Sequence, residues 1–247
     1  MPKISIRGIS FDNITMEEAL LLAKNALEGQ AIRTVVTPNA EIAQLSLENK
    51  DICDIINRAD IILPDGAGIL LAAEILGTPL KEKVAGIDFG ENVIALAEKE
   101  RRSVFFLGGK PGIAEAAAEN IKARFPDLSI AGTNDGYFEK NGEANAAVIQ
   151  KINESGADVL FVCLGAPAQE KWMDINKEKL ISVKLMMGLG GSLDVYAGAV
   201  KRAPNFFVKA RLEWFYRLVK EPRRIVRMMK LPKYILGTVT SRFLKKN

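Results

Sequence analysis

The chain has 247 residues, of which 48% are hydrophobic and 26% charged, with a formal net charge of +4 and no histidine. This composition is typical of a globular protein and excludes a disordered or fibrous chain. Without an imidazole, Ser-His-Asp and Cys-His hydrolysis, histidine general bases and histidine-ligated zinc sites are excluded too.

The thiols and the start of the chain indicate the cytoplasm. Two cysteines cannot form a disulfide framework, so we expect Cys53 and Cys163 to be reduced. Met1-Pro2-Lys3 leads into a short alternating stretch, which does not fit a secretory signal. The longest run without a charged or amide side chain is Val159–Ala168, about half of what a membrane-spanning helix needs.

In chain order, short β-rich runs alternate with helical patterns. The predicted strands are Ile4–Ile6, Ile32–Val36, Ile61–Leu63, Val104–Leu107, Ser129–Gly132, Val159–Leu164 and Val183–Met187. The predicted helices cover about residues 15–28, 40–58, 67–76, 88–100, 112–124, 142–154 and 168–180. This alternation predicts an α/β fold, a Rossmann-like and largely parallel sheet with helices on both faces.

Ligands of such sheets bind beyond the carboxyl ends of the strands, and five loops of small or polar residues follow predicted strands. They are Thr37–Glu41, Pro64–Gly66, Gly108–Gly112, Gly165–Glu170 and Gly188–Asp194. We therefore expect these loops to converge on one rim and to form the site.

Two of these loops are rich in glycine. Gly108 and Gly109 can hold a phosphate with backbone amides or can form an ordinary tight turn, since no complete dinucleotide fingerprint is present. Gly190 and Gly191 allow a backbone to approach a ligand closely, and Asp194 beyond them either binds a ribose or base edge or is a helix N-terminal acid.

The remaining candidates are polar residues directly after strands. Asp65, between Pro64 and Gly66, is in a suitable place for a general base and equally for a turn-forming aspartate. Thr37 and Asn39 are either site groups or, in the case of Asn39, the cap of the helix that starts at Ala40.

Metal binding has no sequence support. No Asp-x-Asp pair occurs, and no cysteine or carboxylate cluster has ligand spacing. If a diphosphate leaves in the reaction, arginines, lysines and backbone amides must meet its charge. The candidate arginines lie near the end of the chain, and their alternative role is a solvated or lipid-facing surface.

The balance of basic and acidic residues changes at about residue 200. Residues 1–200 hold 20 Lys+Arg and 28 Asp+Glu, whereas residues 201–247 hold 14 and 2. We therefore divide the chain into an α/β domain, 1–200, and a basic helical appendage, 201–247, in which cations alternate with large apolar residues. Three interpretations of the appendage stay open: a helix packed on its own domain, a nucleic-acid-binding arm, or an amphipathic element on anionic lipid.

Taken together and in order, these loops resemble the WecB/TagA/CpsF family of bacterial glycosyltransferases. The matching stretches are Thr37–Glu41, Leu63–Ile69, Val84–Asp88, Phe106–Gly109, Gly136–Phe138, Leu164–Trp172, Gly188–Gly198, Arg202–Pro204, Leu212–Leu218, Glu221–Arg224 and Arg227. The resemblance covers nearly the whole chain.

The resemblance implies transfer of a sugar from a UDP-sugar to an undecaprenyl-diphosphate-linked sugar at the cytoplasmic membrane face, with no cofactor. In the TagA-like branch the donor is UDP-N-acetylmannosamine and the acceptor is N-acetylglucosaminyl-diphosphoundecaprenol, a step of wall teichoic acid synthesis. Related branches use UDP-glucose or UDP-N-acetylmannosaminuronic acid in exopolysaccharide synthesis, and that alternative stays open.

By the same resemblance, Asp65 is the base that deprotonates the acceptor hydroxyl, and inversion follows from a single displacement. Thr37 and Asn39 position hydroxyls beside it. The resemblance further implies that Gln169, Glu170 and Asp194, with Gly190 and Gly191 before it, line the nucleotide pocket, and that Arg217, Arg224 and Arg227 close over the diphosphate. Gly108 and Gly109, as the candidate phosphate contact, complete the predicted substrate-binding residues.

The expected partners are the UDP-sugar, the lipid-linked acceptor and an anionic membrane surface, without nucleic acid, and a homo-oligomer in solution is open. The sequence departs from its relatives in two places, which could change the preferred donor sugar. Relatives often have a histidine before Gly-Tyr-Phe, where this chain has Asn134-Asp135, and they commonly have an arginine near the position of Lys83. A non-catalytic lipid- or nucleic-acid-binding protein is the alternative from another class.

Overall fold

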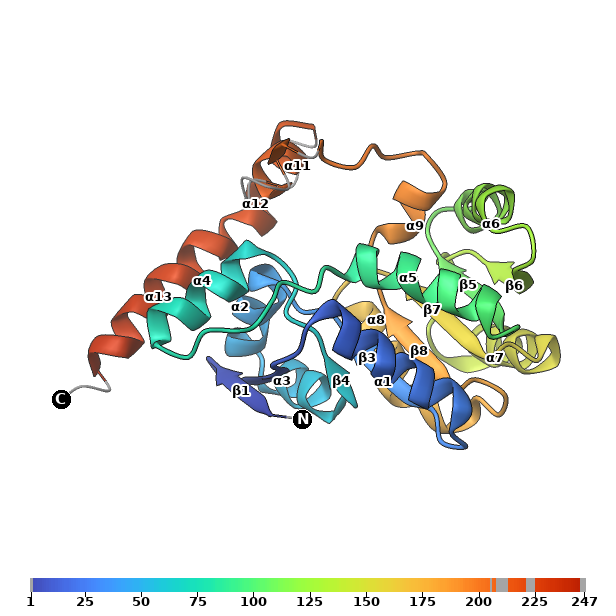
Figure 1. The fold of residues 1–247 in the computed structure, drawn as a ribbon, viewed down its shortest axis with the longest axis horizontal. Helices are drawn as coiled ribbons and strands as arrows, with labels where there is room; N and C mark the ends of the chain where they lie inside the picture. Colours follow the sequence, from blue (N-terminus) through green and yellow to red (C-terminus); the bar gives the residue numbers. More distant parts are fainter. Residues whose placement is uncertain (1, 205, 208–212, 221–224, 245–247) are drawn as a thin grey trace.

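A six-stranded parallel sheet organises the fold of the computed structural model, which describes residues 2–204, 206–207, 213–220 and 225–244 (Figure 1). Its strand order is β4-β3-β8-β7-β5-β6, and β1 and β2 form a separate antiparallel hairpin. The strands are β1 (Lys3–Ile6), β2 (Ile9–Asp12), β3 (Arg33–Val36), β4 (Ile61–Ile62), β5 (Ser103–Gly108), β6 (Ser129–Asn134), β7 (Val159–Cys163) and β8 (Leu185–Gly188). The predicted α/β class is confirmed.

Helices cover both faces of this sheet. They are α1 (Met16–Glu28), α2 (Ala40–Glu48), α3 (Lys50–Arg58), α4 (Ala67–Leu76), α5 (Gly86–Lys99), α6 (Ile113–Arg124), α7 (Gly142–Ser155), α8 (Ala168–Asn176) with the 3-10 turn Lys177–Lys179, α9 (Ser192–Tyr196), α11 (Glu213–Lys220), α12 (Ile225–Met228) and α13 (Lys230–Leu244).

Two hydrophobic cores follow from the alternation of side chains along each strand. In β5, Val104 and Phe106 join a core with α1, α5, α6 and α9, whereas Phe105 and Leu107 join a second core with α2, α3, α4, α7 and α8. Because a strand presents alternate residues to opposite faces, an almost wholly apolar strand such as β7 must be covered on both sides.

Two local features differ from the sequence expectation. The predicted helix 40–58 is wrong as a single helix, because it breaks at Asn49, whose side chain caps α3 through the amide of Ile52. Strand β2 was not predicted, and it pairs with β1 across the turn at Arg7 and Gly8, which both have positive φ.

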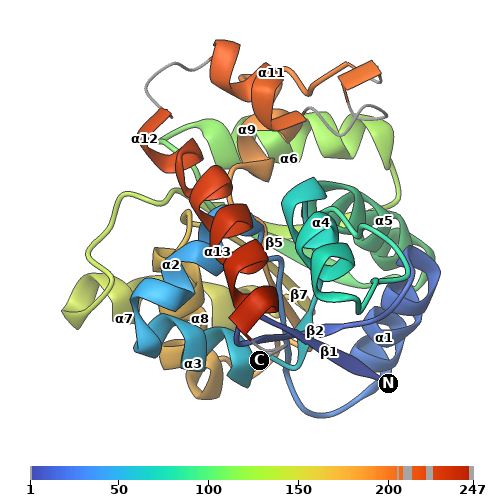
Figure 2. The same cartoon turned by 90° about the vertical axis from the view of Figure 1, so that its left-hand side faces the viewer.

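The C-terminal helix α13 lies at one end of the molecule (Figure 1), where it packs along α2 and α4 (Figure 2). Its Tyr234 is 0% exposed and belongs to the second core, so the packing of α13 crosses the boundary that the charge pattern indicates at residue 200. None of the helices in the described ranges combines the length and apolar character needed to cross a bilayer.

Candidate active site

The candidate site lies at the carboxyl edge of the sheet. All six strands run in the same direction, so the loops that follow β3, β4, β5, β7 and β8 end at this one edge. The expected convergence of the five loops is therefore what the topology produces, and hydrogen bonds join the loops to one another.

Thr37 and Asp65 meet around Gly86, the first residue of α5. The Thr37 hydroxyl donates to the carbonyl oxygen of Gly188 at 3.1 Å, and the Gly86 amide donates to Asp65 Oδ2 at 3.4 Å. A Cβ on Gly86 would lie 2.9 Å from Thr37 Oγ1, so glycine at this position lets the start of α5 pack closely against Thr37. The loops after β3, β4 and β8 are thereby connected around the start of α5, which adjoins both the Thr37 hydroxyl and the Asp65 carboxylate.

Asn39 adjoins the loop of Asp65 and has the capping role expected of it. Its Oδ1 accepts hydrogen bonds from the amides of Glu41 and Ile42 at 3.0 and 3.1 Å. Gly66, with φ of +84°, is the residue before α4, and a Cβ there would be 3.6 Å from that of Asn39. The starts of α2 and α4 therefore converge beside Asp65.

Gln169 and Glu170, in the first turn of α8, lie beneath the glycine loop after β8. Gln169 accepts a hydrogen bond from the Gly190 amide at 2.9 Å and donates one to Glu170 Oε1 at 2.9 Å. The two residues are only 2% and 3% exposed. Both side chains therefore support the loop from within.

Burial also shifts the protonation equilibrium of Glu170. Desolvation raises the pKa of this carboxyl above its usual range, and among the described residues its buried Oε2 atom has no hydrogen-bond partner. A carboxyl in such surroundings favours the protonated form.

The loop of Gly108 and Gly109 packs backbone against backbone with its neighbours. Gly108 has φ of +134°, and a Cβ on it would lie 2.2 Å from the carbonyl oxygen of Cys163. The Gly136 amide donates to the Gly109 carbonyl at 2.9 Å. Glycine is therefore required here by contacts inside the protein, whether or not a phosphate also approaches these amides.

Asp194 is half-buried in the first turn of α9, after the loop of Gly190 and Gly191. Its Oδ2 atom would be 3.7 Å from a Cβ on Gly191, so the carboxylate faces that loop. The site thus has a carboxylate at each of two places, Asp65 beyond β4 and Asp194 beyond β8, with β3 between these two strands.

Two ion pairs bring the C-terminal part of the chain to this edge. Lys83 binds Glu213 of α11 at 2.8 Å, and Arg202 binds Asp88 of α5 at 2.6 Å. Gly86, which the sequence expectations did not include, lies between Lys83 and Asp88; the short motif Val84–Asp88 before a helix was its signal. Of the predicted diphosphate ligands, Arg224 is outside the described residues, as are the side chains of Arg217 and Arg227.

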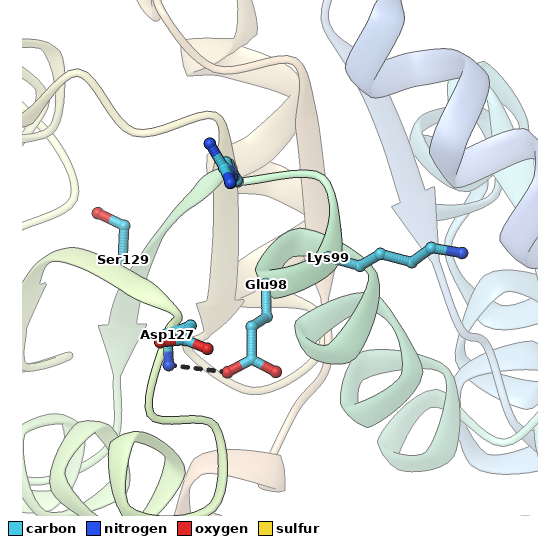
Figure 3. A pocket seen from close by; sticks show the side chains of 5 residues that line it. Glu98, Lys99, Asp127 and Ser129 are labelled. Carbon is cyan, nitrogen blue, oxygen red and sulfur yellow. Dashed lines mark hydrogen bonds between the residues drawn. The ribbon is translucent and has the colours of Figure 1, made fainter.

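A separate pocket lies at the opposite, amino edge, where α5 ends and β6 begins (Figure 3). Glu98, Lys99, Arg101, Asp127 and Ser129 line it, and the Asp127 amide donates to Glu98 at 3.0 Å. None of the predicted site residues contributes to it. Within the described ranges, no three His, Cys, Asp or Glu residues cluster as metal ligands do.

Comparison with known proteins identifies relatives over nearly the whole chain. The model of the glycosyl transferase WecG/TagA/CpsF family matches residues 4–247. A protein of Bacillus subtilis (strain 168) is 33% identical over 98% of this chain and 93% of its own length. One from Bacillus spizizenii is 38% identical over 83% of this chain and 78% of its own. One from Staphylococcus aureus (strain MRSA252) is 34% identical over 93% of this chain and 89% of its own. Each is named N-acetylglucosaminyldiphosphoundecaprenol N-acetyl-beta-D-mannosaminyltransferase.

Proposed function

Because this chain belongs to the WecG/TagA/CpsF family of glycosyltransferases, we propose that it transfers N-acetylmannosamine from UDP-N-acetylmannosamine to N-acetylglucosaminyl-diphosphoundecaprenol. The names of relatives that match most of its length support this substrate pair. The product is a lipid-linked disaccharide, and this step builds the linkage unit of wall teichoic acid. The observation that carries the proposal is the grouping of Thr37 and Asp65 around Gly86 at the carboxyl edge.

In this reaction Asp65 is the general base. Its carboxylate takes the proton of the acceptor hydroxyl as that oxygen forms a bond to the anomeric carbon of the donor. The bond between the anomeric carbon and UDP breaks in the same displacement, so the configuration inverts and the negative charge leaves with UDP. Thr37 and Asn39, beside Asp65, orient sugar hydroxyls, and a positioned base of this kind contributes about 10²–10⁴ to the rate.

The nucleotide occupies the other half of the edge. Asp194 binds ribose hydroxyls, and the amides of the glycine loops approach the diphosphate. Gln169 and Glu170 act from beneath, because their buried hydrogen bonds hold the Gly190 amide in place.

We propose that Arg217, Arg224 and Arg227, rather than a metal ion, neutralise the departing diphosphate. The sequence has no Asp-x-Asp motif, and guanidinium groups bind phosphates through two parallel hydrogen bonds. The ion pairs of Lys83 with Glu213 and of Arg202 with Asp88 support docking of the C-terminal segment at this edge.

Because the proposed acceptor is anchored in lipid, we also propose that the appendage 201–247 binds to the inner face of the cell membrane. Of the sixteen exposed large apolar side chains in the described part of the chain, nine lie in this appendage, from Phe206 to Leu244. Cations flank them in the sequence, as in amphipathic segments that bind anionic lipid. In solution the same apolar side chains can instead pair two copies of the chain.

The first experiment is UDP release from UDP-N-acetylmannosamine with a lipid-linked N-acetylglucosaminyl diphosphate, in EDTA, for the wild type and Asp65→Asn. We expect turnover in EDTA that falls at least about 100-fold in the variant. Asp127→Asn is the matched control, because Asp127 is an exposed loop carboxylate at the opposite edge. Full activity of Asp65→Asn would contradict the role of Asp65.

The same assay separates the alternatives. Turnover with UDP-glucose or UDP-N-acetylmannosaminuronic acid in place of UDP-N-acetylmannosamine would assign the chain to exopolysaccharide synthesis. Loss of turnover in EDTA that returns with Mg²⁺ would contradict metal independence. A chain that turns over no donor and binds duplex DNA with a steep salt dependence would be a nucleic-acid-binding protein.

A further inference from the structure

The turn of the N-terminal hairpin contacts the middle of the C-terminal helix. Arg7 lies between β1 and β2 with φ of +52°, and its guanidinium donates to the carbonyl oxygen of Gly237 in α13. A Cβ on Gly237 would be 3.0 Å from Arg7 Nη2, so glycine at this position lets the cation approach the helix backbone. Tyr234 and Thr238, on the same stretch of α13, are 0% exposed.

Two further contacts hold α13 on the helices that follow the site loops. Glu48 at the end of α2 binds Lys230 at 3.1 Å and Lys233 at 2.7 Å. Near its other end, Arg242 donates to the carbonyl oxygen of Ile75 in α4. Helix α13 is therefore attached at both ends and in the middle, and of these three attachments the middle one joins it to the N-terminal hairpin instead of to α2 or α4.

The first turn of α13 contacts the junction between the starts of α2 and α4, which follow the loops of the candidate catalytic residues. A Cβ on Gly68, in the first turn of α4, would lie 2.5 Å from Leu231 Cδ1 and 2.8 Å from the Cβ of Ala40. Ala40 directly follows Asn39, and Gly68 is three residues after Asp65. The starts of α2, α4 and α13 thus meet at one point beside the base.

We infer that Arg7 is a positioning residue for the transfer reaction. Arg7 fixes the position of α13, and Leu231 of this helix in turn holds the loops of Asn39 and Asp65 in place. Leu231 and Gly237 are six residues apart, or about 9 Å along a helix. A helix transmits a displacement over this distance because it moves as a rigid element. Arg7 touches no substrate, and the inference rests on the proposed function of Asp65.

Arginine is suited to this role by its shape. The planar guanidinium has five donors in a fixed arrangement, so one nitrogen can bind a helix carbonyl while the plane packs against a glycine. A lysine at position 7 has a point charge on a flexible stem and would hold the helix less firmly.

The test compares Arg7→Ala with Arg101→Ala in the full chain. Both arginines have left-handed backbone, with φ of 52° and 53°, so alanine causes similar backbone strain at each. Arg101 is exposed at the amino edge, far from α13. Arg7→Asn is a third variant, because asparagine tolerates this conformation and lacks the guanidinium.

We expect Arg7→Ala and Arg7→Asn to lower kcat for transfer about tenfold or more while the affinity for UDP stays within about twofold, since small misplacements of reacting groups cost this much. Arg101→Ala should change neither quantity. Amide hydrogen exchange should become faster at residues 66–70 and 230–238 in the Arg7 variants and remain unchanged at residues 189–193.

Three results would overturn the inference. The first is a kcat of Arg7→Asn equal to that of the wild type. The second is a parallel loss of UDP affinity and transfer, which indicates a general effect on folding. The third is unchanged exchange at residues 66–70. If the wild type itself turns over no donor, the proposed function fails, and the exchange at residues 66–70 still decides whether Arg7 braces the junction.

Discussion

The hydrogen bonds of Gln169 give a quantitative prediction for the loop that is proposed to hold the nucleotide. Its side chain connects the Gly190 amide to Glu170 Oε1, and within the described part of the chain it provides the one hydrogen bond that this buried carboxyl receives from another side chain. Gln169→Met keeps a side chain of similar volume and removes both bonds. The change therefore isolates their contribution from the packing of the side chain.

The magnitude follows from what the substitution leaves behind. An unpaired buried polar group costs about 1–3 kcal/mol, so Gln169→Met should lower the free energy of unfolding by that amount, mainly through Glu170. For a chain of this size each kcal/mol lowers the melting temperature by about 2–4 °C, which gives a decrease of roughly 2–12 °C. Because the Gly190 amide also loses its acceptor, we expect weaker binding of UDP.

A double-mutant cycle distinguishes this mechanism from a loss of packing. Glu170→Met alone leaves the Gln169 amide unpaired, whereas Gln169→Met with Glu170→Met removes both polar groups. The double variant should therefore be more stable than the sum of the single effects predicts, by at least about 1 kcal/mol, as measured by urea unfolding. Additivity within about 0.5 kcal/mol would refute the reasoning.

Three further predictions concern stability. Tyr234→Phe should raise the free energy of unfolding by about 1 kcal/mol, because the buried Tyr234 hydroxyl has no hydrogen-bond partner among the residues that the structure describes; a lower melting temperature would contradict this. Since burial raises the pKa of Glu170, its ionisation opposes folding above pH 4.5, so Glu170→Gln should gain stability over the wild type as the pH rises from that value, and a constant difference would count against it. Burial raises the pKa of Asp60, but hydrogen bonds from Thr34 and two cations outweigh it and lower that pKa from 3.8 to about 2. The contribution of ionised Asp60 to the free energy of unfolding should therefore be present above pH 3.8 and disappear between there and about pH 2. Asp60→Asn should abolish this part of the acid dependence of stability.

The strands and the site loops could be predicted because their signals are local. Val159–Cys163 is apolar throughout, as a strand buried on both faces must be, and the polar residues after each strand follow from the chain direction alone. The cap at Asn39 could be predicted for the same reason, since its side chain reaches amides only two and three residues away.

Other features depend on contacts between distant parts of the chain. The interior position of Gln169 and Glu170 is set by Gly190, about twenty residues away, and nothing in the local sequence distinguishes a side chain under a loop from one above it. Likewise, the pairing of Arg7 with Gly237 joins residues 230 positions apart. The Arg7-Gly8 turn was a local signal for the hairpin, but it did not indicate which helix the arginine contacts.

Carboxylates occur at both edges of the sheet. Whether a carboxylate precedes or follows a strand distinguishes the carboxylates that stabilise the fold from the candidate catalytic ones. Asp60 and Asp158 precede strands, and each accepts a hydrogen bond at 2.9 Å from a strand amide, that of Thr34 and that of Ser103 respectively. Cations also bind both, so these carboxylates tie the amino ends of the strands together. Asp65 follows a strand, at the edge where glycines let the site loops pack backbone against backbone. A sequence rule results from this geometry: in a parallel sheet, an aspartate just before a strand is to be tested for its effect on stability, and one just after a strand for its effect on turnover.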